Sequence, residues 1–323
     1  MIGKSRIMRV LVTGGAGFIG SHLVDALIAA GHETITIDNL ATGVRENLNP
    51  QARFYEADIR DAAAVNQIFA DERPEVLIHE AAQLDVRRSV ADPAYDADVN
   101  ILGTLRLLQA GVENGLQKVI FASSGGAIYG DTEIMPTPET QATAPISPYG
   151  VSKLSIEHYL HYFHTIHGLP YVALRYSNVY GPRQNPHGEA GVISIFAERL
   201  LRGEPTTIYG DGENTRDYVY VKDVVAANLA ALTSERVGAY NVGTATKTTV
   251  NEIFDRINRL TEAGAQEQHG EAKAGEQRHS CLSWELARCE LGWQPRIGLD
   301  EGLAQTVEFF IEKTRRASVE GQR

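Results

Sequence analysis

Tyr149 and Lys153 lie four residues apart in the stretch SPYGVSK, directly after Pro148. Proline is favoured in the first turn of a helix, and residues four apart on a helix are neighbours. A tyrosine beside a lysine could act as a base, because a phenol with a pKa of about 10 needs a nearby positive charge to ionise at neutral pH. By spacing alone, the two residues could equally lie on a solvated helix face.

A glycine-rich turn is the second candidate for chemistry. Gly14, Gly15, Gly17 and Gly20 follow the strand pattern at residues 9–13 and open an amphipathic helical pattern. Glycines at this spacing allow a tight turn, a close approach of the backbone to a pyrophosphate, and close packing of the helix on the sheet. The free amides at the helix start would bind the anion. The sequence therefore predicts a dinucleotide-binding turn.

Two acidic residues end the next two strand patterns. Asp38 ends the second strand, close to the spacing of about 20 residues at which an acid contacts the adenosine ribose. A carboxylate there accepts hydrogen bonds from both ribose hydroxyls and repels a 2′-phosphate, which favours NAD over NADP. Asp58 ends the third strand and is a candidate for holding the adenine. The alternative for both residues is a role in a turn.

Composition limits the partners of the chain. Its net charge of −11 argues against binding to nucleic acid or to an anionic membrane. Cys281 and Cys289 lack the spacing of a disulfide framework or a zinc site, so we expect no metal and a reducing compartment. The sequence shows no signal-peptide pattern and no apolar run approaching about 18 residues. We therefore expect a cytoplasmic protein.

The elements that must position these residues alternate regularly in the first half of the chain. Strand patterns at 9–13, 34–38, 53–58, 75–80, 118–124 and 171–176 alternate with helical patterns. This alternation predicts an α/β fold with a doubly wound parallel (Rossmann) sheet. After residue 178, long polar loops are followed by helical patterns at 191–202, 221–234, 249–263, 284–291 and 299–315. We expect an NAD-binding domain at 1–177 and a smaller, mainly substrate-binding α/β domain at 178–323, with 221–245 returning to the first sheet.

A series of motifs extends over nearly the whole chain. In order, they are TGGAGFIGSH (13–22), DN (38–39), HEAA (79–82), VNILGT (99–104), FASSGGAIYG (121–130), SPYGVSK (147–153), LRYSNVYGPRQ (174–184), YGDGENTRDYVYVKD (209–223) and YNVG (240–243). With these motifs the chain resembles the extended short-chain dehydrogenase/reductase superfamily, and within it the NAD-dependent nucleotide-sugar epimerases typified by UDP-galactose 4-epimerase. The resemblance implies inversion at C4 of a UDP-hexose through a 4-keto intermediate.

The resemblance assigns catalytic roles to Ser124, Tyr149 and Lys153. Tyr149 is the base, and Lys153 together with the nicotinamide lowers its pKa. Ser124 shares the hydrogen bond to the substrate hydroxyl. Counted back from Tyr129, the loop is one residue longer than in some members of the family, which leaves Ser123 as an alternative.

The resemblance also implies the binding residues. Those for NAD are Gly14, Gly17, Phe18, Ile19, Gly20, Asp38, Asn39, Asp58, Ile59, Ala81, Ala82, Asn100, Tyr149, Lys153 and Tyr176. Those for the UDP-sugar are Ser124, Tyr149, Asn178, Tyr209, Arg216, Lys273, Glu276 and Ser280. Tyr209 would stack on the uracil, and Ser280 occupies the position of a gate residue beside the sugar.

One departure from the family pattern and several alternative functions bear on this assignment. The usual Arg-Pro-Gly-Asp stretch is KAGE here, so Lys273 cannot form the two-pronged contact of an arginine, and Glu276 is longer than the usual aspartate. Gly125 and Gly126 follow Ser124, where dehydratases and decarboxylases of the superfamily carry an acid, so these activities are less expected. A uronate 4-epimerase stays open, and a non-catalytic NAD(H)-binding regulator is disfavoured because Tyr149 and Lys153 are both present. The resemblance further implies a homodimer through a four-helix bundle.

Overall fold

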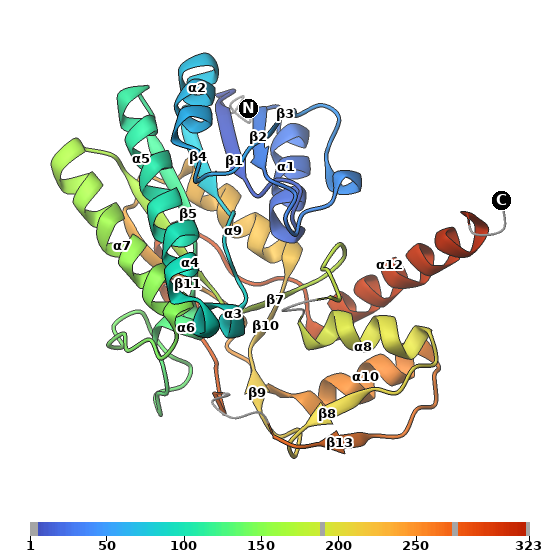
Figure 1. Cartoon of the computed structure of the whole chain (residues 1–323). Helices are drawn as coiled ribbons and strands as arrows, with labels where there is room; N and C mark the ends of the chain where they lie inside the picture. The colour runs from blue at the N-terminus through green and yellow to red at the C-terminus, as the bar shows by residue number, and fades with distance from the viewer. Residues whose placement is uncertain (1–5, 188–190, 273–276, 321–323) are drawn as a thin grey trace, which may run out of the picture.

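A seven-stranded parallel sheet forms the centre of the computed structural model, which describes residues 6–187, 191–272 and 277–320 (Figure 1). The strand order is β11-β6-β5-β4-β1-β2-β3. The strands are β1 (Arg9–Thr13), β2 (Glu33–Asp38), β3 (Arg53–Glu56), β4 (Val76–His79), β5 (Lys118–Ser124), β6 (Tyr171–Tyr176) and β11 (Gly238–Val242). The predicted α/β fold with a doubly wound parallel sheet is confirmed.

The strands form because they carry continuous apolar runs, as strands covered on both faces must. Val10, Leu11 and Val12 of β1 are completely buried, and every residue of β6 is buried. β3 and β4 end earlier than their apolar patterns predicted. Asp58 and Glu80 therefore lie in the loops that follow these strands, at the carboxyl ends of the sheet.

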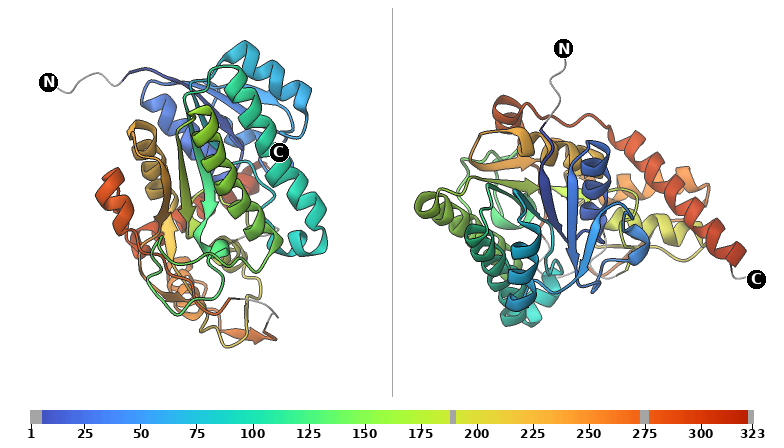
Figure 2. Two further views of the ribbon diagram at one scale, coloured as in Figure 1. Left: turned by 90° about the vertical axis from the view of Figure 1, so that its left-hand side faces the viewer. Right: turned by 90° about the horizontal axis from the view of Figure 1, so that it is seen from above.

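Helices cover both faces of the sheet (Figures 1 and 2). One face carries α1 (Phe18–Ala29), α9 (Val221–Thr233) and α11 (Glu285–Leu291). The other face carries α2 (Ala62–Glu72), α5 (Thr104–Glu113) and α7 (Pro148–His167). Each face has its own apolar core, so the sheet is held rigidly between two helical layers.

The start of α7 places the tyrosine and the lysine. Ser147 caps the helix by accepting a hydrogen bond from the amide of Gly150 at 3.2 Å, and Pro148 follows as the first helical residue. Tyr149 thus lies in the first turn and Lys153 one turn further on. The pair shares one helical face, as its spacing predicted.

Short helices surround the carboxyl ends of β4 and β5. They are α3 (Val86–Ala91), α4 (Pro93–Ala97), the π-helical segment η2 (Asp98–Gly103) and α6 (Gly125–Ile128). The 3-10 turn η1 (Arg45–Asn47) follows β2 instead. The strand order reverses between β1 and β4, because the chain continues from β1 toward β3 and from β4 toward β6. Ligands of doubly wound sheets bind at the carboxyl ends of the strands at such a reversal.

A second, separate core lies beside the sheet, at the lower right of Figure 1. Its elements are β7 (Asn178–Tyr180), α8 (Val192–Leu201), β8 (Thr207–Tyr209), β9 (Thr215–Arg216), β10 (Tyr218–Tyr220), β12 (Thr248–Thr249), α10 (Val250–Thr261), β13 (Gln268–Gly270) and α12 (Leu299–Glu320). The strands form three two-stranded sheets, β10-β7, β12-β9 and β13-β8. Phe196, Phe254 and Phe310 are buried in this core. In the part of the chain that the structure describes, no helix has the length and apolar character needed to span a bilayer.

Candidate active site

Ser124, Tyr149 and Lys153 meet at the carboxyl end of β5. The Tyr149 hydroxyl is hydrogen-bonded to Ser124. The Lys153 ammonium donates to the carbonyl of Ala122 at 2.7 Å and lies 5.8 Å from the centroid of the Tyr149 ring. The structure thus brings together the three residues expected to be catalytic.

Burial dominates the protonation of this group. It raises the pKa of Tyr149, an effect that the hydrogen bond from Ser124 opposes and the negative charges of Asp96 and Glu80 reinforce. Burial also lowers the pKa of Lys153 to about 8, against the opposing influence of Glu80 and Asp96. The protein by itself therefore does not bring the phenol's pKa down. A phenolate at Tyr149 needs a further positive charge beside it.

Ser123 and Ser124 have different partners. The Ser123 hydroxyl donates to the carboxylate of Glu157 at 2.6 Å, and this carboxylate pairs with Arg175 at 2.6 Å. Ser123 is therefore engaged in a buried network beneath α7, while Ser124 faces Tyr149. The geometry favours Ser124 over its neighbour as the partner of the phenol.

The glycine-rich turn after β1 forms a narrow cradle. Gly14 has a φ of +72°, and a Cβ added to it would lie 2.9 Å from the Ala81 amide nitrogen. A Cβ at Gly20 would lie 2.1 Å from the Gly14 carbonyl oxygen, so α1 packs closely on the turn. Gly17 precedes Phe18 and Ile19 without a capping side chain. The first amides of α1 are thus open to an anion such as a pyrophosphate, which fits the expected dinucleotide.

Asp38 is held at the end of β2 by two backbone amides. Its Oδ2 accepts from Ala16 at 3.0 Å and its Oδ1 from Leu40 at 2.8 Å. Burial raises the pKa of Asp38, and both hydrogen bonds oppose this effect. A carboxylate oriented in this way retains lone pairs for the two hydroxyls of a ribose. Its negative charge does not suit the additional phosphate of NADP.

Asp58 cross-links the loops after β2 and β3. Its Oδ2 accepts from Asn39 at 2.9 Å and from the Arg60 guanidinium at 2.8 Å. The hydrogen bonds from Arg60 hold the pKa of Asp58 well below its usual range. Ile59 is buried next to it, and a Cβ added to Gly103 would lie 2.8 Å from its side chain. Both residues shape the wall where an adenine is expected.

The Asn100 side chain forms hydrogen bonds to other residues of the protein. Its Oδ1 accepts from the Gln83 amide at 2.9 Å, and its Nδ2 donates to the Gln83 carbonyl at 2.8 Å and to Asp96 at 3.0 Å. These bonds fix the loop that carries Ala81 and Ala82 after β4. The side chain of Asn100 thus positions this loop beside the glycine-rich turn.

Tyr176 ends β6 and contacts an acid that the sequence analysis did not single out. Its hydroxyl donates to Glu80 at 2.8 Å and accepts from Asn228 at 2.7 Å. Glu80 is the acid of the HEAA motif and directly follows β4. An acidic side chain directly after a buried strand was the available signal.

A cavity of about 660 Å³ lies in the second core, with α3 contributing to one wall. Asn178, Tyr209 and Arg216 all line it, together with Arg87 of α3 and Phe196 of α8. The ring of Tyr209 is 48% exposed, so it offers a face on which a base could stack. Three of the expected substrate residues are thus brought together, while Lys273 and Glu276 lie outside the described residues.

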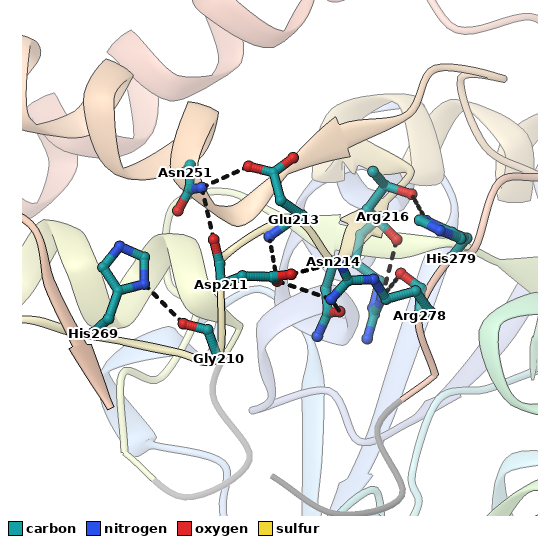
Figure 3. A network of polar contacts seen from close by, with 10 residues as sticks. Gly210, Asp211, Glu213, Asn214, Arg216, Asn251, His269, Arg278 and His279 are labelled. Carbon is teal, nitrogen blue, oxygen red and sulfur yellow. Dashed lines mark hydrogen bonds and ion pairs between the residues drawn. The ribbon is translucent and has the colours of Figure 1, made fainter. Parts of the chain in front are cut away.

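A polar network supports Arg216 at one end of this cavity (Figure 3). The Arg216 guanidinium donates to the Thr215 carbonyl at 2.9 Å and reaches the Arg278 carbonyl at 3.4 Å. Arg278 itself forms a fork onto Asp211, with distances of 2.8 and 2.7 Å, and contacts Asn214 at 3.0 Å. The loop before β9 is therefore tied to the segment that follows residue 276.

Ser280 lies on a segment that passes the end of β5. Its side chain is buried and its amide donates to the Thr215 carbonyl at 3.1 Å. Two residues further on, Leu282 packs on Gly125, where an added Cβ would lie 2.3 Å from the leucine side chain. Asp217 fixes this segment by accepting from the Leu282 amide at 3.1 Å. The segment that carries Ser280 thus packs against Gly125, the residue after Ser124, although Ser280 does not line the 660 Å³ cavity.

Comparisons with known proteins agree with this geometry. The NAD dependent epimerase/dehydratase family matches residues 10–243. The UDP-glucose 4-epimerase of Mycolicibacterium smegmatis is 45% identical over 314 residues, which cover 95% of this chain and 100% of that protein. The UDP-glucose 4-epimerase of Thermotoga maritima, solved with UDP-glucose, is 50% identical with a TM-score of 0.94 and covers 95% of this chain and 100% of its own. The Thermus thermophilus enzyme, solved with NAD, is 47% identical with a TM-score of 0.91, covering 94% and 99%.

Proposed function

Because the chain belongs to the NAD dependent epimerase/dehydratase family, we propose that it is an isomerase that interconverts UDP-glucose and UDP-galactose by inversion at C4. One observation carries this proposal. Tyr149 is hydrogen-bonded to Ser124 and lies beside the Lys153 ammonium, at the same end of the sheet as the glycine-rich cradle. This arrangement suits the removal of a proton from a sugar hydroxyl next to a bound dinucleotide.

The protein has the groups to hold NAD. The amides of Phe18 and Ile19 would bind the pyrophosphate, Asp38 the adenosine ribose, and the two loops joined by Asn39 and Asp58 the adenine end. Bound NAD supplies the acceptor that takes a hydride from the sugar carbon and gives it back. The residues of the chain therefore need to hold the cofactor through the whole cycle.

The side chains handle the proton. Tyr149 takes the proton of the 4-hydroxyl, which leaves a 4-keto sugar once the hydride has also left C4. Ser124 donates a hydrogen bond to the same oxygen, and the charge of Lys153 stabilises the phenolate before the proton arrives. After the sugar turns to present its other face, Tyr149 returns the proton. This sequence inverts C4 and regenerates the starting state of the enzyme.

The cavity in the second core holds the parts of the substrate that do not react. Arg216 and Asn178 would contact the diphosphate, and Tyr209 would stack on the uracil. Firm binding there leaves the sugar free to rotate at the end of β5. We accordingly assign residues 1–177 mainly to cofactor binding and 178–323 mainly to the substrate, with 221–245 completing the first sheet.

The size of the gate residue bears on the sugar. Ser280 is small and buried, and it lies two residues before Leu282, which packs against Gly125. A serine leaves room for a 2-acetamido group, which a tyrosine would exclude. We therefore include UDP-GlcNAc and UDP-GalNAc among the substrates.

The dehydratase alternative fits less well. An acid next to Ser124 would have to replace Gly125, and any side chain at that position would collide with Leu282. Gly126 has open space around it, but it also carries no acid. The chain therefore has no acidic residue at this position to eliminate water from the sugar.

An exposed apolar face supports a homodimer. On α7, Val151 is 48% exposed, Tyr162 48% and Ile166 62%, and Leu102 beside α5 is 46% exposed. α5 and α7 lie side by side on the outside of the molecule (Figures 1 and 2). Two copies that pack these helices together would form a four-helix bundle. Sedimentation of the purified protein tests this, and a monomer at all concentrations would contradict it.

A panel of UDP-, dTDP- and GDP-hexoses, N-acetylhexosamines and uronates tests the function. We expect UDP-glucose and UDP-galactose to interconvert without added reductant, with products separated by their configuration at C4. Turnover of uronates alone would assign the protein to the uronate 4-epimerases. Failure to convert any nucleotide sugar, with NAD bound, would refute the proposed activity.

A further inference from the structure

Glu80 is a carboxyl group at the candidate site to which the mechanism above gives no role. It directly follows His79, the last residue of β4, and is partly buried. Since the strand order reverses between β1 and β4, Glu80 stands at the crevice where the cofactor binds. A Cβ added to Gly14 would lie 3.1 Å from the carbonyl carbon of Glu80, so it borders the glycine-rich turn.

The hydrogen bonds around Tyr176 show that Glu80 accepts, and does not donate, the hydrogen bond between these two residues. Asn228 donates from Nδ2 to the Tyr176 hydroxyl oxygen at 2.7 Å and to the Val224 carbonyl at 3.0 Å, which uses both amide protons. The proton of the Tyr176 hydroxyl therefore goes to Glu80 Oε1, 2.8 Å away. Oε1 is an acceptor whether or not the carboxyl group is ionised.

The strand register places this carboxyl group at the same end of the sheet as the Lys153 ammonium. β4, β5 and β6 are neighbours, with His79 paired to Phe121 and Ser124 paired to Tyr176. Lys153 donates to Ala122, which lies on β5 between these two pairs. Glu80 and the Lys153 ammonium therefore approach the same strand end from opposite sides.

Three further groups that titrate or carry charge face this end of the sheet. Thr104 gives its proton to the Asn100 carbonyl and so accepts from His79 Nε2, while burial lowers the pKa of His79 to about 3, so this imidazole is neutral. Asp96 is bound by Ser152 at 2.6 Å, and Tyr149 is the expected base. Burial raises the pKa of Glu80 to about 7, while Tyr176 and Lys153 lower it. Glu80 thus changes its charge near neutral pH, and Lys153, at the same end of the sheet, does so at slightly higher pH.

We propose that Glu80 is a positioning residue whose carboxylate keeps Lys153 protonated and favours the oxidised form of the cofactor over the reduced form. A negative charge stabilises a neighbouring ammonium group, and by the same sign it stabilises the positive nicotinamide ring relative to its neutral reduced form. Glu80 exchanges no proton with the substrate. This inference rests on the proposed function and adds a residue that sets the charge at the site.

Glu80→Gln tests the proposal, because it retains the size and an acceptor oxygen for Tyr176 but removes the charge. We expect the alkaline limb of the kcat profile to move to lower pH by about one unit, a tenfold change in the proton affinity of Lys153. Glu80→Asp keeps the charge and should return the alkaline limb of the kcat profile to its wild-type pH. Glu72→Gln is a matched control, since Glu72 is also buried and accepts from a tyrosine, Tyr55, at 2.6 Å, outside the site. Its profile should match that of the wild type.

A second measurement needs no turnover. The dissociation constants of NAD and NADH are measured by exchange against a labelled cofactor. The ratio of the NAD constant to the NADH constant should rise roughly 3- to 10-fold in Glu80→Gln, because NAD loses a favourable charge. Unchanged profiles and an unchanged ratio would overturn the proposal. If the wild type converts no UDP-sugar, the proposed function fails, while the binding ratio still decides the role of Glu80.

Tyr176→Phe provides a further test if Glu80→Gln does not fold. It removes the donor to Oε1 and so raises the pKa of the Glu80 carboxyl group, which should increase the same ratio at neutral pH and leave it normal at alkaline pH. A ratio that does not depend on pH in this variant would contradict the proposal.

Discussion

Lys153 of α7 donates a hydrogen bond to the carbonyl of Ala122 on β5, 2.7 Å away. This contact holds the ammonium group against the end of the strand, 5.8 Å from the Tyr149 ring. A lysine buried in this way is charged only over a limited pH range, and the catalytic proposal depends on that charge.

Turnover should fall as the pH rises through about 8, because Lys153 then loses the charge that stabilises the phenolate. The check is kcat measured across neutral and alkaline pH. Lys118→Met is the control, since Lys118 is a second buried lysine, bonded to the Ala231 carbonyl away from the site. This variant should keep the alkaline limb. A wild-type profile that stays flat through this range would argue against a role for Lys153.

Tyr149→Phe should lower kcat by at least about 100-fold, because it removes the base and leaves the ring packing in place. UDP binding, measured by calorimetry, should change little since Tyr149 does not line the cavity of Arg216 and Tyr209. Tyr55→Phe removes a hydroxyl group outside the site and should keep full turnover. Near-normal activity of Tyr149→Phe would move the base to another residue.

The purified native protein should release one NAD(H) per chain and little NADP(H), since the Asp38 carboxylate is oriented to accept from the ribose hydroxyls and would repel a 2′-phosphate. Asp38→Ser should weaken NAD binding by about tenfold or more, the loss expected for hydrogen bonds to a charged group. The affinity for NADP should fall less or rise. Cofactor extraction and direct titration measure both, and mainly NADP(H) in the wild-type extract would refute the assignment of Asp38.

Ser280→Tyr should selectively abolish conversion of UDP-GlcNAc and UDP-GalNAc. The added ring would collide with a 2-acetamido group, which the plain hexoses lack. The plain hexoses serve as the internal control, and kcat/KM for both pairs is the measurement. Equal loss of both activities, or no turnover of N-acetylated sugars by the wild type, would show that Ser280 is not the gate.

Arg175→Met should destabilise the protein by about 3–5 kcal/mol, because it leaves the buried carboxylate of Glu157 without its partner. Urea unfolding gives the free energy of unfolding. Arg288→Met, which breaks an exposed ion pair with Glu285, should cost less than about 1 kcal/mol. Similar values for the two variants would mean that the buried pair is not stabilising.

Features that depend on neighbouring residues were predictable from the sequence. The glycine-rich turn, the strand that precedes it and the common face of Tyr149 and Lys153 all follow from short spacings with a known geometry. The residue pattern also located Asp38 correctly at the end of β2.

Features that join distant segments were not predictable in this way. The contact of Tyr176 with Glu80 needs β4 and β6 to lie on either side of β5, and no local pattern shows that neighbourhood. The same holds for Asp217, which reaches the amide of Leu282. The hydrogen bonds by which the Asn100 side chain fixes the loop at Gln83 also join segments that no local pattern brings together. Only the folded chain shows which polar groups are already engaged.

The position of β11 at the edge of the sheet has a consequence for synthesis on the ribosome. β6 ends at Tyr176, but its outer neighbour starts at Gly238, after much of the second core has been made. A nascent chain thus carries β6 as an unpaired edge during this interval, and such edges promote aggregation. Pairing across so long a stretch of sequence is slow. Chaperone dependence should therefore be greatest for chains released before Val242 has emerged.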